Sequence, residues 1–298
     1  MMPVSSAPSR WRRFVAHPAS RLGLGFIWLT FMLGLSQVLA GTLTALPELL
    51  RAALQVATML LAYAAFERFV ERRPMPELAL PGALPEAGVG VVLGTLLFSA
   101  AIGLIALAGG YRVEGPGSWQ SLAPMLAMAL AAAVGEELLF RGLVFRVAEA
   151  WLGSWGALAL SSGIFGALHL ANPHATLTAA LAIALEAGLL LGAAWLVTRR
   201  LWLAIGIHAG WNFTQGGVFG VAVSGNQVKG LLRGTLSGPE WLTGGEFGAE
   251  ASLVAVLVCL TAGVGLLLLA RGRGHWAAAP WRSKLGAGLS AAAEPSPK

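Results

Sequence analysis

Two adjacent glutamates and an arginine, at Glu136, Glu137 and Arg141, lie inside one of the most apolar parts of this chain. An ionisable side chain at the middle of a membrane helix costs about 2.5 to 3.5 kcal/mol on insertion scales, so such a group needs a partner or a function. Glu137 and Arg141 are four residues apart, which places them on one helix face and allows them to pair. Glu136 points about 100° away from Glu137 and gains no partner from this spacing. Glu136 is therefore the candidate for chemistry, and Glu137 with Arg141 the candidate structural pair.

Two later apolar segments supply histidines and an asparagine. His169 follows Phe165 by four residues in one segment, and His208 precedes Asn212 by four residues in another, so each pair shares a helix face. At 1.5 Å per residue, Glu136, His169 and His208 lie about 20, 22 and 12 Å from the cytoplasmic ends of their helices. Helix tilt can absorb this difference, so the depths are compatible with one interior site.

Such a site could activate water for hydrolysis. A carboxylate such as Glu136 can act as a general base, and an imidazole such as His169 can orient the water. Asn212 and His208 could donate hydrogen bonds to an oxyanion. Glu136, His169 and His208 are also an acceptable zinc set with an open fourth position. The chain has no His-Glu-x-x-His, no Gly-x-Ser-x-Gly and no aspartate, so the familiar zinc-protease, serine-hydrolase and paired-aspartate sites are excluded.

A simpler interpretation exists for each residue taken alone. A single buried histidine is more often an interhelical hydrogen-bonding group than a catalyst. A charge cluster near a helix end can also extend its side chains to the membrane surface. The simpler interpretation accounts for Glu137 and Arg141 but leaves Glu136 without a partner. The presence of three polar motifs on successive apolar segments favours a shared site.

The composition predicts that membrane-spanning helices position these residues. The 298 residues are 56% hydrophobic and only 11% charged, with a mean hydropathy of +0.72, whereas soluble domains are about 25% charged. A bilayer admits only helices or closed barrels, and these apolar runs are too long for barrel strands. The fold class is therefore all-α, a polytopic membrane protein with about eight helices around a polar cavity. The expected spans are about 22–46, 51–66, 88–109, 118–150, 154–170, 176–198, 201–221 and 251–270.

The charged residues predict the orientation of these spans. Basic residues concentrate at the ends that would face the cytoplasm, which favours an even number of spans and both termini inside. They form no continuous stripe, so the net charge of +6 indicates a lipid bilayer and not a nucleic acid as partner. We expect a cytoplasmic segment at 1–21, one transmembrane domain at 22–270 and a flexible basic tail at 271–298. A cleaved signal peptide is the competing interpretation of the first span, although its apolar stretch exceeds the usual 7 to 15 residues.

Three other features complete the expectations. The 17 arginines against three lysines are a weak sign of a GC-rich bacterial genome, and hence of a bacterial inner membrane. The segment 224–250 is polar and glycine-rich and is expected to be an external loop. Glu186 is an isolated acid in the sixth span, for which a structural role is the first interpretation. Cys259, the single cysteine, lies in an apolar run and is expected to serve packing.

The motifs together resemble those of the CAAX-protease and bacteriocin-processing family of intramembrane proteases, also called Rce1-like or type II CAAX prenyl endopeptidases. The matching elements are the Glu136-Glu137-x-x-x-Arg141, Phe165-x-x-x-His169 and His208-x-x-x-Asn212 motifs, within about residues 122–213.

The resemblance implies an eight-helix fold with a water-filled cavity and a protease-like core at about 118–221. It also implies hydrolysis of a peptide bond in a membrane-associated or lipid-modified substrate. Glu136 and His169 would activate water, His208 and Asn212 would stabilise the oxyanion, and Glu137, Arg141 and Phe165 would support the site. The resemblance leaves two catalytic schemes open for the same residues: one in which zinc is a cofactor, and one in which glutamate activates water without a metal. The alternative function is a non-catalytic membrane protein that binds a partner or gives self-immunity against a bacteriocin.

Overall fold

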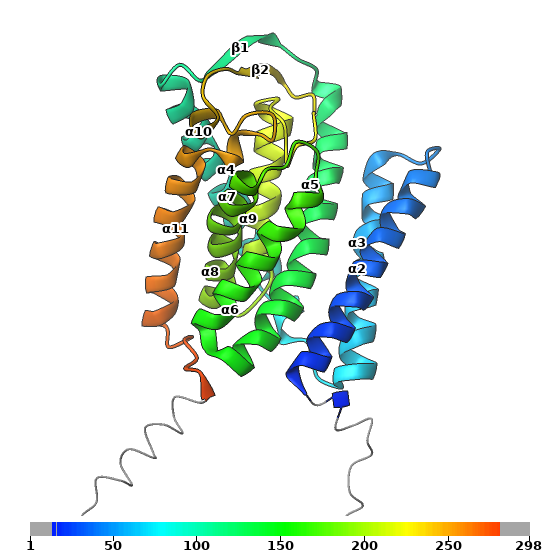
Figure 1. Ribbon diagram of the computed structural model, residues 1–298. Helices are drawn as coiled ribbons and strands as arrows, with labels where there is room; N and C mark the ends of the chain where they lie inside the picture. The colour runs from blue at the N-terminus through cyan, green and yellow to red at the C-terminus, as the bar shows by residue number, and fades with distance from the viewer. Residues whose placement is uncertain (1–13, 16, 281–298) are drawn as a thin grey trace, which may run out of the picture.

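The computed structural model describes residues 14–15 and 17–280 as a bundle of helices with a small sheet at one end (Figure 1). The apolar runs form helices because a helix satisfies its own backbone polar groups where no water is present. The α-helices are α2 Pro18–Thr42, α3 Glu48–Ala65, α4 Ala83–Leu107, α5 Leu122–Glu137, α6 Arg146–Leu168, α7 Leu177–Ile183, α8 Leu189–Thr198, α9 Trp202–Asn212, α10 Glu240–Thr243 and α11 Leu253–Gly272. Shorter π-helical segments are η1 Phe66–Glu71, η4 Leu138–Phe145, η6 Ala184–Gly188 and η7 Phe213–Val218, and 3-10 turns are η2 Pro76–Leu78, η3 Trp119–Ser121, η5 His169–Ala171 and η8 Ala249–Ala251. The predicted all-α membrane class is confirmed, with the sheet as a minor addition.

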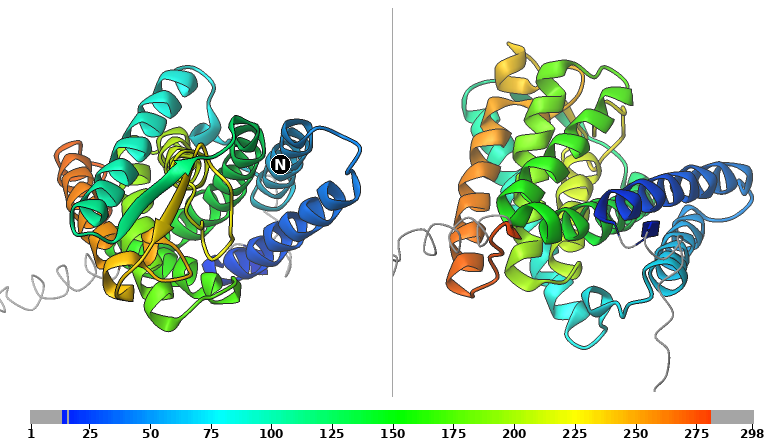
Figure 2. Two further views of the ribbon diagram at one scale, coloured as in Figure 1. Left: turned by 90° about the horizontal axis from the view of Figure 1, so that it is seen from above. Right: turned by 60° about the horizontal axis from the view of Figure 1, so that its bottom comes forward.

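The helix pair α2–α3 lies at one edge of the bundle and α11 lies at the opposite edge (Figures 1 and 2). The α3 helix packs on α5, while α4 and α9 pack together along their lengths. The two ends of the described chain lie at the end of the bundle opposite to the sheet (Figure 1). The residues 1–13, 16 and 281–298, which hold most of the expected cytoplasmic segment and basic tail, lie outside the described part.

Six helical segments of the described chain are long and apolar enough to cross a membrane: Pro18–Thr42, Glu48–Glu71, Ala83–Leu107, Trp119–Ala171, Leu177–Thr198 and Leu253–Gly272. The segment Trp119–Ala171 has 53 residues and includes Gly153, whose φ of 72° and ψ of 175° are not helical. It therefore includes both the fourth and the fifth expected spans. The expected seventh span corresponds to α9 and η7, which lie outside these six segments. The count of eight stays a prediction.

The polar segment 224–250 is more structured than expected. Its β2 strand, Leu232–Leu236, pairs antiparallel with β1, Tyr111–Pro116, and the short α10 and η8 follow. The expectation of a plain loop is wrong here because the partner of β2 comes from a distant part of the chain, which local sequence patterns do not reveal. The Tyr111 hydroxyl donates to the Phe219 carbonyl at 3.0 Å and ties the sheet to the end of the bundle.

The α4–α9 contact depends on glycines. A Cβ atom added to Gly94 would lie 2.1 Å from the Ile207 carbonyl oxygen, and one added to Gly206 would lie 2.2 Å from the Ala87 carbonyl oxygen. The two backbones therefore touch, as small residues allow in membrane helix packing. This close contact fixes the position of α9, which carries His208.

A cluster of ion pairs joins α3 to the main bundle. The Arg146 guanidinium binds Glu67 at 2.8 Å and Glu71 at 2.9 Å, and Arg73 binds both Glu67 and Glu77 at 2.5 Å. The second span was expected to end at Phe66 in a charged turn, but the helix continues to Glu71 and Glu67 is fully buried. Ion pairing with two arginines explains how these acids can remain inside the protein.

Glu77 connects this cluster to the motif helix. Tyr63 donates its hydroxyl proton to Glu77 at 2.5 Å, and the same hydroxyl lies 3.1 Å from the Gly142 carbonyl oxygen in η4. Burial raises the pKa of Glu77, but the hydrogen bonds from Arg73 and Tyr63 outweigh burial and hold the pKa below its ordinary value. The acid therefore stabilises the fold as a carboxylate.

Candidate active site

Glu137 and Arg141 form a fully buried ion pair at the junction of α5 and η4. The Arg141 Nη1 atom donates to Glu137 Oε1 at 2.8 Å, and neither side chain is exposed. The Arg141 Nη2 atom donates to the carbonyls of Ala187 and Gly188 at 3.2 and 3.0 Å. These carbonyls belong to the π-helical segment η6, where the regular helical hydrogen-bond pattern changes. Arg141 therefore links the motif helix to the sixth span.

His208 lies on α9 and contacts Glu137 from the other side. Its Nδ1 atom lies 3.0 Å from Glu137 Oε1. An ionised carboxylate can only accept hydrogen bonds, so the proton of this contact belongs to His208 Nδ1. The same Oε1 atom accepts the hydrogen bond from Arg141 Nη1. Nε2 is then the His208 nitrogen available for chemistry, and Glu137 orients this ring as well as pairing with Arg141.

Glu136 lies close to this Nε2 atom. The distance from Glu136 Oε2 to His208 Nε2 is 3.9 Å. This distance is too long for a direct hydrogen bond, but one water could contact both atoms. The Glu136 side chain is 25% exposed, and its Oε2 atom is buried without a hydrogen-bond partner. The acid that the spacing left unpaired thus faces a histidine from a distant helix.

His169 stands at the end of α6, where the chain changes from α-helix to a 3-10 turn. Its Nδ1 atom lies 2.8 Å from the Phe165 carbonyl oxygen, which can only accept, so Nδ1 carries the proton and Nε2 is left available. The Phe165 ring packs against His169 at 4.7 Å between centroids and against His208 at 6.3 Å. The Arg141 guanidinium carbon lies 5.0 Å from the centroid of the same ring. Phe165 therefore fixes the relative positions of both histidines and of Arg141 by packing.

A cavity of about 30 Å³ lies among these side chains. His169, His208 and Asn212 line it together, so the structure gathers residues from the fifth and seventh spans around one space. A volume of this size holds one or two waters. Asn212 is only 9% exposed, and it lines this cavity from the end of α9.

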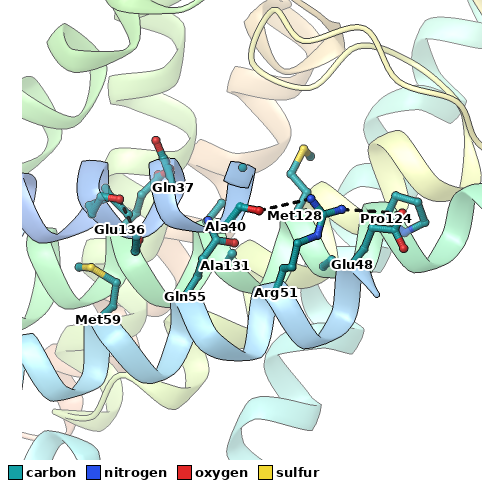
Figure 3. Close-up of a pocket in the computed structure, with 16 residues that line it drawn as sticks. Gln37, Ala40, Glu48, Arg51, Gln55, Met59, Pro124, Met128, Ala131 and Glu136 are labelled. Carbon is teal, nitrogen blue, oxygen red and sulfur yellow. Dashed lines mark hydrogen bonds and ion pairs between the residues drawn. The ribbon is translucent and has the colours of Figure 1, made fainter. Parts of the chain in front are cut away.

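Glu136 lines a second and larger cavity of about 350 Å³, which lies between α2, α3 and α5. Figure 3 shows Glu136 at one end of this cavity and Arg51 farther along it. The contact between Glu136 and His208 therefore lies where the two cavities approach each other. A substrate in the larger cavity would contact Glu136, whereas His169 and His208 line the smaller cavity.

Two acids and a serine that the motifs did not include also line the smaller cavity: Glu186, Glu250 and Ser224. Glu250 is 2% exposed and accepts a hydrogen bond from the Ser224 backbone N–H at 2.5 Å. Burial holds the pKa of Glu250 above its ordinary value, and the hydrogen bond from the Ser224 backbone and the nearby His169 offset only part of this rise. Glu186 contacts the thiol of Cys259 and lies near Glu250. Only the acid content of the segment 224–250 could have indicated Glu250, since nothing in its spacing connects it to His169.

The expected zinc set of Glu136, His169 and His208 stays a prediction. Across residues 14–15 and 17–280, no three histidine, cysteine or acidic side chains gather at a spacing that could hold a metal ion. His208 Nδ1 is used by Glu137, and His169 Nδ1 by a backbone carbonyl. Both histidines keep Nε2 available, and an imidazole whose other nitrogen donates to a carboxylate or a carbonyl is a common metal ligand.

Residues 118–214 match the family model described as type II CAAX prenyl endopeptidase Rce1-like. The match includes Glu136, His169, His208 and Asn212, and it confirms the resemblance that the three motifs indicate. No curated protein and no solved structure matches the chain. With its apolar helices, the chain is an integral membrane protein related to a family of intramembrane proteases that act on peptide substrates.

Proposed function

We propose that this protein is an intramembrane endopeptidase in which Glu136 acts as the general base. The observation that carries the proposal is the 3.9 Å distance between Glu136 Oε2 and His208 Nε2, beside the cavity lined by His169 and Asn212. A general base must reach the proton it takes directly or through one water, and this distance allows that geometry.

The proposed reaction is hydrolysis of a peptide bond. Glu136, assisted by His169, takes one proton from a water, and the water oxygen attacks the peptide carbonyl carbon. Asn212 donates a hydrogen bond to the oxyanion that forms, and so does His208 as an imidazolium, which carries a proton on Nε2 as well as on Nδ1. The carbon–nitrogen bond then breaks, and the amine leaves with the proton that Glu136 holds. Glu137 and Arg141 act as positioning residues, because Glu137 orients His208 and Arg141 holds Glu137.

The membrane setting defines the substrate class. The site lies among helices that are apolar enough to span a bilayer, so the substrate is a membrane-associated or lipid-modified protein or peptide. We infer from the distribution of basic residues that both termini lie in the cytoplasm, and from the excess of arginine over lysine that the membrane is a bacterial inner membrane.

The test is cleavage of a peptide library by the purified protein in lipid vesicles. Glu136→Gln and His169→Ala should each abolish cleavage while the far-UV circular dichroism and the elution volume stay unchanged. Glu48→Gln is the matched control, because Glu48 lines the larger cavity with Glu136 but belongs to α3. Full activity in either site variant would refute the proposal and would favour a non-catalytic binding protein.

A further inference from the structure

The 350 Å³ cavity beside Glu136 has the lining of a peptide site. The α2 helix contributes Gln37, and α3 contributes Gln55, Arg51 and Met59 (Figure 3). An amide side chain both donates and accepts hydrogen bonds, as a peptide backbone does. A substrate that unwinds within a membrane needs partners for its backbone polar groups. Two glutamines on facing helices can supply such partners.

Arg51 is the only basic residue among the side chains that line this cavity. Its contacts within the protein are long: 3.4 Å from Nη1 to the Ala40 carbonyl oxygen and 3.9 Å from Nη2 to the Glu48 carboxylate. Its Nε atom is buried without a hydrogen-bond partner, and its side chain is 25% exposed. A guanidinium presents donors in a planar fork that fits a carboxylate through two parallel hydrogen bonds. Arg51 thus has unused capacity to bind an anion in the cavity.

The distance between Arg51 and Glu136 sets a length for the ligand. Met59 lines the cavity beside Glu136 and packs near Gly135, so it marks the level of Glu136 on α3. Arg51 precedes Met59 by eight residues, which corresponds to about 12 Å along the helix. An extended chain covers about 3.3 to 3.6 Å per residue, so three to four residues fit between Glu136 and Arg51.

We infer that Arg51 is a specificity residue that binds a carboxylate of the substrate three to four residues from the cleaved bond. This inference rests on the proposed endopeptidase function, because that function places the reacting bond at Glu136. The substrate lies extended in the cavity with its backbone on Gln37 and Gln55. The carboxylate is that of an acidic side chain within the substrate.

The experiment measures both cleavage and binding. The probes are neutral internally quenched peptides and versions with one glutamate at each of six positions from the cleaved bond, each made with a free or an amidated C-terminus. In wild type, a carboxylate at the third or fourth position should raise kcat/KM by about five- to tenfold, as expected for one partly exposed charged hydrogen-bond pair. Arg51→Gln should remove this preference, so that acidic and neutral peptides are cleaved with equal kcat/KM, while Arg51→Lys should keep part of it. If amidation of the C-terminus removed the preference, Arg51 would bind the end of the peptide chain and the inference would be overturned.

Two controls keep the inference separate from the proposed function. Arg112→Gln changes an exposed arginine on β1 that does not line the cavity, and it should not alter the preference. Fluorescent versions of the same peptides are also titrated against Glu136→Gln protein with and without Arg51→Gln, which measures the preference without hydrolysis. An equal ratio of acidic to neutral peptide binding in both proteins overturns the inference, even if cleavage is confirmed. Loss of anionic-lipid binding in Arg51→Gln, with peptide preference unchanged, would assign Arg51 to a lipid headgroup and also overturn it.

Discussion

The substitution Arg141→Met removes one partner of a fully buried ion pair and leaves the other in place. Breaking a buried pair in this way costs about 3 to 5 kcal/mol, because the remaining charge loses its compensation. Arg141 also donates to the carbonyls of Ala187 and Gly188, and interhelical hydrogen bonds in membranes average about 0.6 kcal/mol each. These contributions are not additive, so we expect a loss of about 4 kcal/mol in the free energy of unfolding.

The assay is reversible unfolding in mixed micelles, followed by tryptophan fluorescence, for four proteins: wild type, Arg141→Met, Glu137→Leu and the double variant. The double variant removes both charges, so it should lose less stability than the sum of the single variants by about 2 kcal/mol or more. Arg112→Met, on the exposed face of β1, should not change the unfolding midpoint. Additive losses in the double variant, or an unchanged Arg141→Met protein, would refute the assignment of this pair as a structural link.

Three further predictions follow from the packing and the acids. Gly94→Ala should lose about 1 to 3 kcal/mol of stability because its methyl group would collide with the Ile207 carbonyl. Gly103→Ala on the same helix has open space and should lose no stability in the same unfolding assay. The pKa of Glu77 is lower in the folded protein than its ordinary value of 4.5. Its carboxylate therefore stabilises the fold fully above pH 4.5, and this contribution disappears as the pH falls through the folded-state pKa. Glu77→Gln should therefore be less stable than wild type at pH 7, and the stability of wild type should fall toward that of the variant as the pH drops below the folded-state pKa of Glu77. An equal difference in the free energy of unfolding at all pH values would contradict this. Glu250→Gln removes a carboxylate that interacts electrostatically with His169, so it should lower peptide cleavage by about 10-fold and alter its pH profile without loss of folding. Unchanged kinetics would remove Glu250 from the site.

Local spacing was sufficient to predict part of the site. The interval of four residues between Glu137 and Arg141 predicts their pairing, because helical periodicity alone brings them together. The charges in an apolar segment also marked Glu136 as unusual, since a buried acid without a partner is costly. Both inferences depend only on residues within one helix.

Contacts between distant segments could not be predicted in this way. The hydrogen bond from His208 to Glu137 depends on how α9 packs against α5, and that packing depends on glycine contacts between α4 and α9. The place of Glu250 depends on the fold of the segment 224–250, which forms a strand with β1 instead of a plain loop. The sequence also did not reveal that Glu136 faces a large cavity formed with α2 and α3.

Chemical rescue of Glu136→Ala tests the central claim most directly. This variant removes the carboxylate and leaves space next to the 350 Å³ cavity, through which a small acid such as formate can enter. We predict that Glu136→Ala does not cleave a peptide that wild type cleaves, and that formate restores a measurable, concentration-dependent rate. Cleavage by Glu136→Ala at the wild-type rate without formate would contradict the role of Glu136 as general base.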